Sequence, residues 1–60
     1  MMHEQALKAV TDLLGAQAVT DHITGRAHST QVQVACILAV DGGGQLTAAD
    51  IAAIQSLSAP

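Results

Sequence analysis

Apolar residues are densest between positions 31 and 57, where two apolar segments flank a turn rich in glycine. The first segment, 31–40, is apolar at eight of its ten positions. A helix that is apolar on every side is normally buried on every side. Thr30 and Gln33 have the spacing of a capping box that would begin this helix, and the glycines at 42–44 suit the left-handed conformation that ends one. We therefore predict a fully buried helix over 31–40.

The same segment also alternates as a β-strand does, because every second side chain is apolar and β-branched side chains are common in it. The alternating residues are Val32, Val34, Cys36, Leu38 and Val40. A single strand would have no pairing partner in the rest of this chain, so a strand here would require a second chain. The helix is the favoured interpretation, and a strand paired across a dimer stays open.

The second apolar segment, 47–57, predicts a helix with two distinct faces. Thr47 is placed to cap its N-terminus, and the negative charge of Asp50 favours the positive end of the helix. One face carries large apolar side chains at a spacing of three, which are Ile51, Ile54 and Leu57. The other face carries small side chains that would let another backbone come close, which are Ala49, Ala52, Ala53 and Ser56.

The N-terminal half of the chain predicts two further helices. The first has one apolar face, made of Leu7, Val10 and Leu14. In the same helix Glu4 and Lys8 are spaced to form an ion pair. A weaker helix follows, and glycines at 15 and 25 end the two helices. The predicted fold class is therefore all-α, a single domain built as a small bundle of about four short helices at 3–14, 16–24, 31–40 and 47–57.

The composition indicates that one chain can hardly complete the core of such a bundle. Half of the 60 residues are apolar, but none of them is aromatic. A domain of this size buries only about 60% of its unfolded surface, and aromatic side chains are the largest single contributors to a core. We therefore expect a protein partner, either a second copy in a homo-oligomer or a larger protein. The expected contact residues are Leu13, Ala49, Ala52, Ala53, Ile54 and Ser56.

Charge and cysteine content restrict the choice of partner and compartment. The net charge is −3 and the only basic residues are Lys8 and Arg26, which disfavours nucleic acid because its binding depends on neutralising phosphates. No apolar run approaches the roughly 18 residues of a membrane span, and the N-terminus lacks the pattern of a secretion signal. A lone cysteine, Cys36, excludes an internal disulfide and suits a buried position in a cytoplasmic protein.

No residue pattern predicts a cofactor, a metal site or catalysis. His3, His22, His28 and Cys36 have no spacing typical of structural zinc. A calcium loop over 39–50 would lack two of three oxygen side chains, and the glycine run lacks the lysine that completes a phosphate loop. A chain of 60 residues also rarely encloses a substrate pocket. We therefore expect a protein that is not an enzyme.

Residues 31–60 resemble the first half of winged-helix domains of the MarR type, which contain a helix-turn-helix. In those domains a helix and a glycine-containing turn precede the pattern Leu-Thr-x-x-Asp/Glu-Ile/Leu-Ala, which is present here at 46–52. The resemblance implies that Thr47 caps the second helix and that Leu57 packs in the core of the turn. The recognition helix should begin near Ser58, and no base-reading side chain follows it, so the resemblance implies packing geometry more than DNA binding.

These observations favour a small interaction protein that acts as a regulator, inhibitor or adaptor of a larger protein. Two alternatives remain open. One is a transcription regulator derived from a helix-turn-helix domain, for which binding to duplex DNA should fall steeply with added salt. The other is a structural subunit of a larger assembly, such as a phage particle, which should sediment as large particles.

Overall fold

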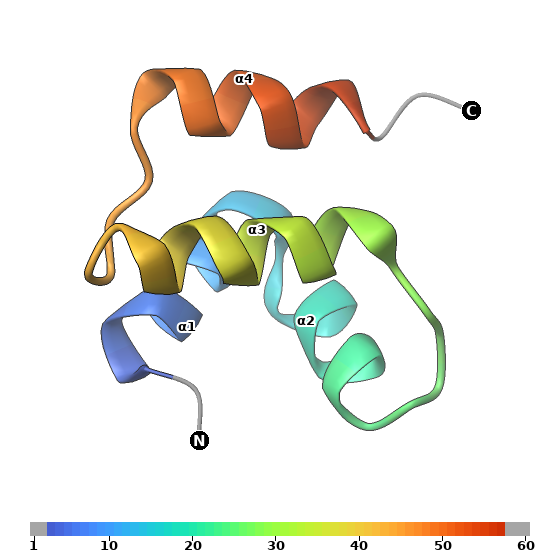
Figure 1. Ribbon diagram of the computed structural model, residues 1–60. Helices are drawn as coiled ribbons and strands as arrows, with labels where there is room; N and C mark the ends of the chain where they lie inside the picture. Colours follow the sequence, from blue (N-terminus) through green and yellow to red (C-terminus); the bar gives the residue numbers. More distant parts are fainter. Residues whose placement is uncertain (1–2, 58–60) are drawn as a thin grey trace.

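The computed structural model describes residues 3–57, which form four α-helices joined by short connections (Figure 1). The helices are α1 (Glu4–Leu14), α2 (Ala16–Ile23), α3 (Thr30–Asp41) and α4 (Ala48–Ser56). The all-α prediction is confirmed, and each predicted boundary falls within one residue of the observed one. Residues 30–41 are helical, so the alternative of a strand across a dimer is wrong. No helix of the described region is long and apolar enough to cross a membrane.

Helix α3 is the centre of the arrangement, because it packs against each of the other three helices. Figure 1 shows α3 crossing in front of α1 and α2, with α4 running along its other side. The Cα atoms span 28 × 27 Å in two directions and only 15 Å in the third. The molecule is therefore a slab little thicker than one packed helix pair, since packed helix axes lie 8–10 Å apart.

The core is small and built from small side chains contributed by all four helices. Its members are Ala6, Val10, Val19, Val32, Ala35, Ala39 and Ile54. Three of these seven residues are alanine, and alanine lets neighbouring helices approach closely. Five partly buried leucines pack against these residues, and no aromatic side chain is present to add to them.

The helix starts follow the predicted capping at α4 but not at α3. At α4, Thr47 Oγ1 accepts from Asp50 N–H at 3.1 Å, and Asp50 Oδ2 accepts from Thr47 N–H at 3.2 Å. At α3 the predicted cap, Thr30, is wrong by one position. Ser29 has the extended backbone of a cap, and its hydroxyl accepts from Val32 N–H at 3.2 Å. Two adjacent hydroxyl residues make this position ambiguous from sequence, because serine caps at least as well as threonine.

The ion pair on α1 also differs from the prediction. Lys8 has an acid one turn away on each side, and its ammonium lies 2.9 Å from Asp12 Oδ2 rather than at Glu4. The hydrogen bond to Asp12 raises the pKa of the Lys8 ammonium above its ordinary value of 10.5. Both side chains of the pair are largely exposed, so the pair adds little to stability.

The glycine turn after α3 brings α4 back along the bundle and touches the start of α1. Gly44 has a φ of +99°, in the region that favours glycine. A Cβ built on Gly44 would lie 2.6 Å from Gln5 Cβ on α1. The close approach of the turn to α1 therefore depends on glycine at this position. Near the C-terminal end of α4, Gln31 Nε2 on α3 donates a hydrogen bond to Ile54 O at 3.0 Å. This bond links α3 to α4.

Candidate interaction surface beside helix α3

Helix α3 is buried on one side only, although its sequence is apolar on nearly every side. Val32, Ala35 and Ala39 have at most 1% of their surface exposed. In contrast, Ile37 is 60% exposed and Val40 is 48% exposed. The prediction of a fully buried helix is therefore wrong for this chain alone. The physical reason is a shortage of cover, because three helices of eight to eleven residues enclose only part of the circumference of α3.

The exposed side of α3 forms one wall of an apolar groove, and the end of α2 forms the other. Ile23, at the C-terminal end of α2, is 58% exposed and faces the same groove as Ile37 and Val40. Cys36 also lines the groove and is half-buried. The groove has a volume of about 600 Å³. Three of the four large apolar side chains that are exposed in the described region therefore gather at a single place.

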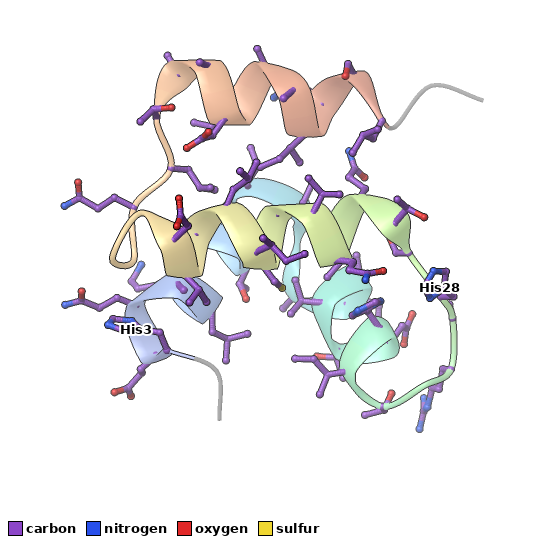
Figure 2. The ribbon with its side chains drawn as sticks, viewed as in Figure 1. His3 and His28 are labelled. Atoms are coloured by element: carbon purple, nitrogen blue, oxygen red, sulfur yellow. The ribbon has the colours of Figure 1, made fainter. Side chains whose placement is uncertain are left out.

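Among the described residues, the polar side chains that line this groove are His22 and Asp41. His22 is held in place because its Nδ1 accepts from Ser29 N–H at 3.3 Å. The ring of His28 lies beside the ring of His22, with 5.8 Å between centroids. Figure 2 shows His28 in the connection that enters α3. The groove thus has an apolar floor with one carboxylate and one imidazole at its margin.

The thiol of Cys36 is free, and burial raises its pKa above the ordinary value of 9.0. A thiol is nucleophilic only as the thiolate, so Cys36 is poorly suited to covalent chemistry at neutral pH. In residues 3–57, no group of three or more His, Cys, Asp or Glu side chains is close enough to hold a metal ion. Apart from this thiol, the described lining of the groove consists of three aliphatic side chains, one imidazole and one carboxylate.

The contact residues expected from sequence have different positions in the structure. Ala49, Ala52, Ala53 and Ser56 are exposed along one side of α4. Leu13 is half-buried and lines a shallow hollow between α1 and α4 with Leu46 and Ile51. Ile54 has no exposed surface, so it belongs to the core of this chain and its expected place at an interface is wrong. The structure does not test the other five, which stay a prediction, and none of them lines the groove between α2 and α3.

Ile23, Ile37 and Val40 were not predicted from the sequence to be surface residues. A signal for α3 was present, because Gln33, Ile37 and Val40 are spaced by four and three residues and so share one face of a helix. A glutamine on that face indicates that the face meets water. No comparable signal existed for Ile23, because its exposure depends on where α2 ends against α3.

Comparison of the chain with protein-family models, with curated proteins and with solved structures finds no match. The resemblance of residues 31–60 to winged-helix domains therefore stays a prediction. The structure does contain the helix, turn and capped helix on which that resemblance rests. Ser58, where a recognition helix should begin, lies outside the described residues.

Proposed function

We propose that this chain is a small, non-enzymatic protein–protein interaction module that pairs with a second copy of itself through the groove between α2 and α3. In this form it acts as a regulator or adaptor of a larger protein. The observation that carries the proposal is the exposure of Ile37, Ile23 and Val40 together, on and beside the most apolar helix. Exposed apolar patches that are rimmed by polar residues mark interaction sites. The free thiol of Cys36 supports a cytoplasmic location.

The size of the molecule is compatible with a stable pair. A standard interface takes about 800 Å² from each partner, which is roughly one fifth of the 4006 Å² of accessible surface on this chain. The slab has a broad face of 28 × 27 Å, so one face can supply that area. A second copy placed against the groove would give the exposed side of α3 an apolar neighbour.

The chemistry of the groove favours a second copy over a charged peptide. Among the described residues that line the groove there is no Lys or Arg and one carboxylate, that of Asp41, so a strongly basic or acidic segment would leave most of its charges unpaired. In an isologous pair each copy contributes the same surface. A second copy therefore brings Ile23, Ile37 and Val40 to the apolar floor, together with one imidazole and one carboxylate for the margin.

The experiment is sedimentation equilibrium from low to high micromolar concentration, with two matched variants. Ile37→Gln removes an exposed apolar side chain inside the groove, and Leu57→Gln removes one outside it, where Leu57 is 45% exposed. We expect the wild type and Leu57→Gln to dimerise alike and Ile37→Gln to dimerise at least about tenfold more weakly, as for a residue at the centre of an interface.

Salt provides a second readout of the same experiment. Each copy carries a net charge of −3, so two copies repel each other and added salt should strengthen the dimer. Binding to nucleic acid would show the opposite dependence. A wild type that stays monomeric throughout the concentration range, or a dimer that Ile37→Gln leaves unchanged, would overturn the proposal.

A further inference from the structure

The two ends of α3 differ in charge. The connection over 24–29 enters α3 at one end and the glycine turn leaves it at the other (Figure 1). The helix has 12 residues, so its ends are about 16–18 Å apart at roughly 1.5 Å per residue. Asp41 lies at the C-terminal end, and Arg26 lies in the connection that leads to the N-terminal end. Both side chains are exposed, so another molecule can reach both.

Asp41 occupies a position that is unfavourable for a carboxylate. It is the last residue of α3, and the C-terminus of a helix carries a partial negative charge. No basic residue lies in the last turn of this helix. Within residues 3–57 the one ion pair joins Lys8 to Asp12, so no cation of the described chain offsets the charge of Asp41. Because Asp41 also lines the groove, a cation on a partner that fills the groove would stabilise this end of α3.

Arg26 is the one of the two basic residues that is not in that ion pair. Its backbone N–H donates to Asp21 O at 2.9 Å, which holds Arg26 at the C-terminal end of α2, close in sequence to Ile23 of the groove. The carboxylate of Asp21 itself accepts from Gln17 Nε2 at 2.8 Å. No acidic residue lies in the first turn of α3, so this end of the helix favours an anionic group from a partner.

Two copies related by a twofold axis can align their α3 helices in the same direction or in opposite directions. In the same direction each end of α3 meets an identical end, so that like charges face each other. In opposite directions the end that carries Asp41 meets the end near the partner's Arg26, and the symmetry makes this contact twice. The antiparallel alignment also brings opposite helix ends together. The aliphatic side chains of the groove carry no charge and favour neither direction, so the charged ends decide.

We propose that the two copies pair with their α3 helices antiparallel, and that Arg26 of each copy contacts Asp41 of the other and fixes this direction. The inference rests on the pairing through the groove proposed above and adds its direction. Exposed ion pairs contribute little to affinity, but like charges placed face to face suppress a wrong alignment. Arg26 and Asp41 therefore determine the specificity of the pairing, whereas the apolar side chains of the groove supply its affinity.

The test is sedimentation equilibrium of variants with reversed charges, at a single ionic strength. In the antiparallel pair, Arg26→Glu and Asp41→Arg each create two contacts between like charges. We expect each variant to associate with itself about fivefold more weakly than the wild type. An equal mixture of the two variants forms heterodimers in which both contacts again join opposite charges, and so does the double variant with itself. Both should regain about the association of the wild type.

Two variants on α1 control for the change in net charge. Lys8→Glu changes the net charge as Arg26→Glu does, and Asp12→Arg changes it as Asp41→Arg does, but neither position lines the groove. Asp41→Arg is the most informative variant because it changes the net charge from −3 to −1. A general charge effect would then strengthen self-association, whereas the loss of the proposed contact weakens it. A cation in the last turn of α3 also favours the helix, so this variant should fold.

The results separate the direction of pairing from the pairing itself. The antiparallel alignment is overturned if Arg26→Glu and Asp41→Arg associate as their matched controls do while Ile37→Gln still weakens the dimer. The pairing through the groove then stands. Failure of both the mixture and the double variant to recover would also overturn the contact between Arg26 and Asp41. A wild type that stays monomeric overturns the alignment together with the proposed function.

Discussion

The two sides of α3 have similar apolar character but opposite environments. Toward the bundle, Val32, Ala35 and Ala39 are buried, and toward the groove, Ile37 and Val40 are about half exposed. The buried side carries the smaller residues and the exposed side carries the only isoleucine of the helix. In a chain that folds for itself alone, the larger apolar side chain would be expected inside. The apolar content of a helix therefore indicates how much of its surface needs to be buried, but not whether residues of the same chain bury it.

The largest difference in stability is expected between substitutions of a buried isoleucine and of an exposed one. Ile54 of α4 lies in the core with no exposed surface, whereas Ile37 is 60% exposed. Truncating Ile54→Ala should cost about 2–5 kcal/mol of unfolding free energy, because it leaves a cavity. Ile37→Ala should change the stability of the monomer by less than about 0.5 kcal/mol. Urea denaturation at low protein concentration measures both.

Because Ile54→Ala can abolish folding in so small a domain, Ile54→Val serves as the milder variant, with an expected cost of about 0.5–1.5 kcal/mol. Equal costs at positions 37 and 54 would show that both side chains are buried in the monomer. In that case the groove would not exist as described.

A second comparison stays within α3 and uses the same substitution twice. Val32 is 1% exposed and Val40 is 48% exposed. Val32→Ala should cost about 2 kcal/mol, from about 0.8 kcal/mol for each carbon removed from the core and the space left behind. Val40→Ala should cost less than half as much in the monomer but should weaken self-association. Thermal unfolding at two protein concentrations separates these effects, and a larger loss of stability at Val40 would reverse the assignment of sides.

A smaller effect is expected from substitutions at the N-terminus of α3, which test at which residue this helix begins. Ser29→Ala should cost about 1 kcal/mol, because it removes the hydroxyl that accepts from Val32 N–H. Thr30→Ala should cost much less, because Thr30 is exposed and already inside the helix. Urea denaturation compares the two. If Thr30→Ala proves the costlier change, α3 begins one residue later than the structure shows.

The smallest effect concerns Cys36, which lies at the boundary between the two sides. Since burial raises the pKa of its thiol above 9.0, the folded protein disfavours the thiolate. The corresponding contribution to stability is present below pH 9 and is lost as the pH rises through the folded pKa. We expect alkylation of Cys36 near neutral pH to be slower than that of a free cysteine, and slower again at high protein concentration if the proposed dimer covers the groove. Alkylation at the free-cysteine rate at every concentration would place Cys36 outside any interface.

Local sequence signals predicted the positions of the four helices well, but they predicted poorly which helix faces are buried. Thr47 and Asp50 cap α4 as a pattern of hydroxyl and acid predicts, and the glycines placed the helix ends within one residue. His3 was missed as the cap of α1 because histidine is not among the preferred capping residues. Ile54 was assigned to an interface because periodicity shows that a face is apolar but not which neighbour covers it.

The groove itself could not be predicted from the sequence. Its walls come from Ile23 on α2 and Ile37 on α3, which are separated by a connection whose path no local pattern determines. The groove exists because α2 is only eight residues long and because α4 packs along another side of α3. Both features depend on how the helices pack, which no local pattern in the sequence shows. The sequence indicated only that the apolar surface exceeded what four short helices cover.

The most direct measurement is an isotope-filtered NOE experiment on an equal mixture of ¹³C-labelled and unlabelled protein, at a high protein concentration that favours the proposed dimer. We predict intermolecular NOEs between the methyl groups of Ile23, Ile37 and Val40 of one copy and those of the other. We predict none to the methyl groups of Ala49, Ala52 and Ala53 on α4. Intermolecular NOEs confined to those alanines, or absent altogether from Ile37, would contradict the proposed pairing through the groove.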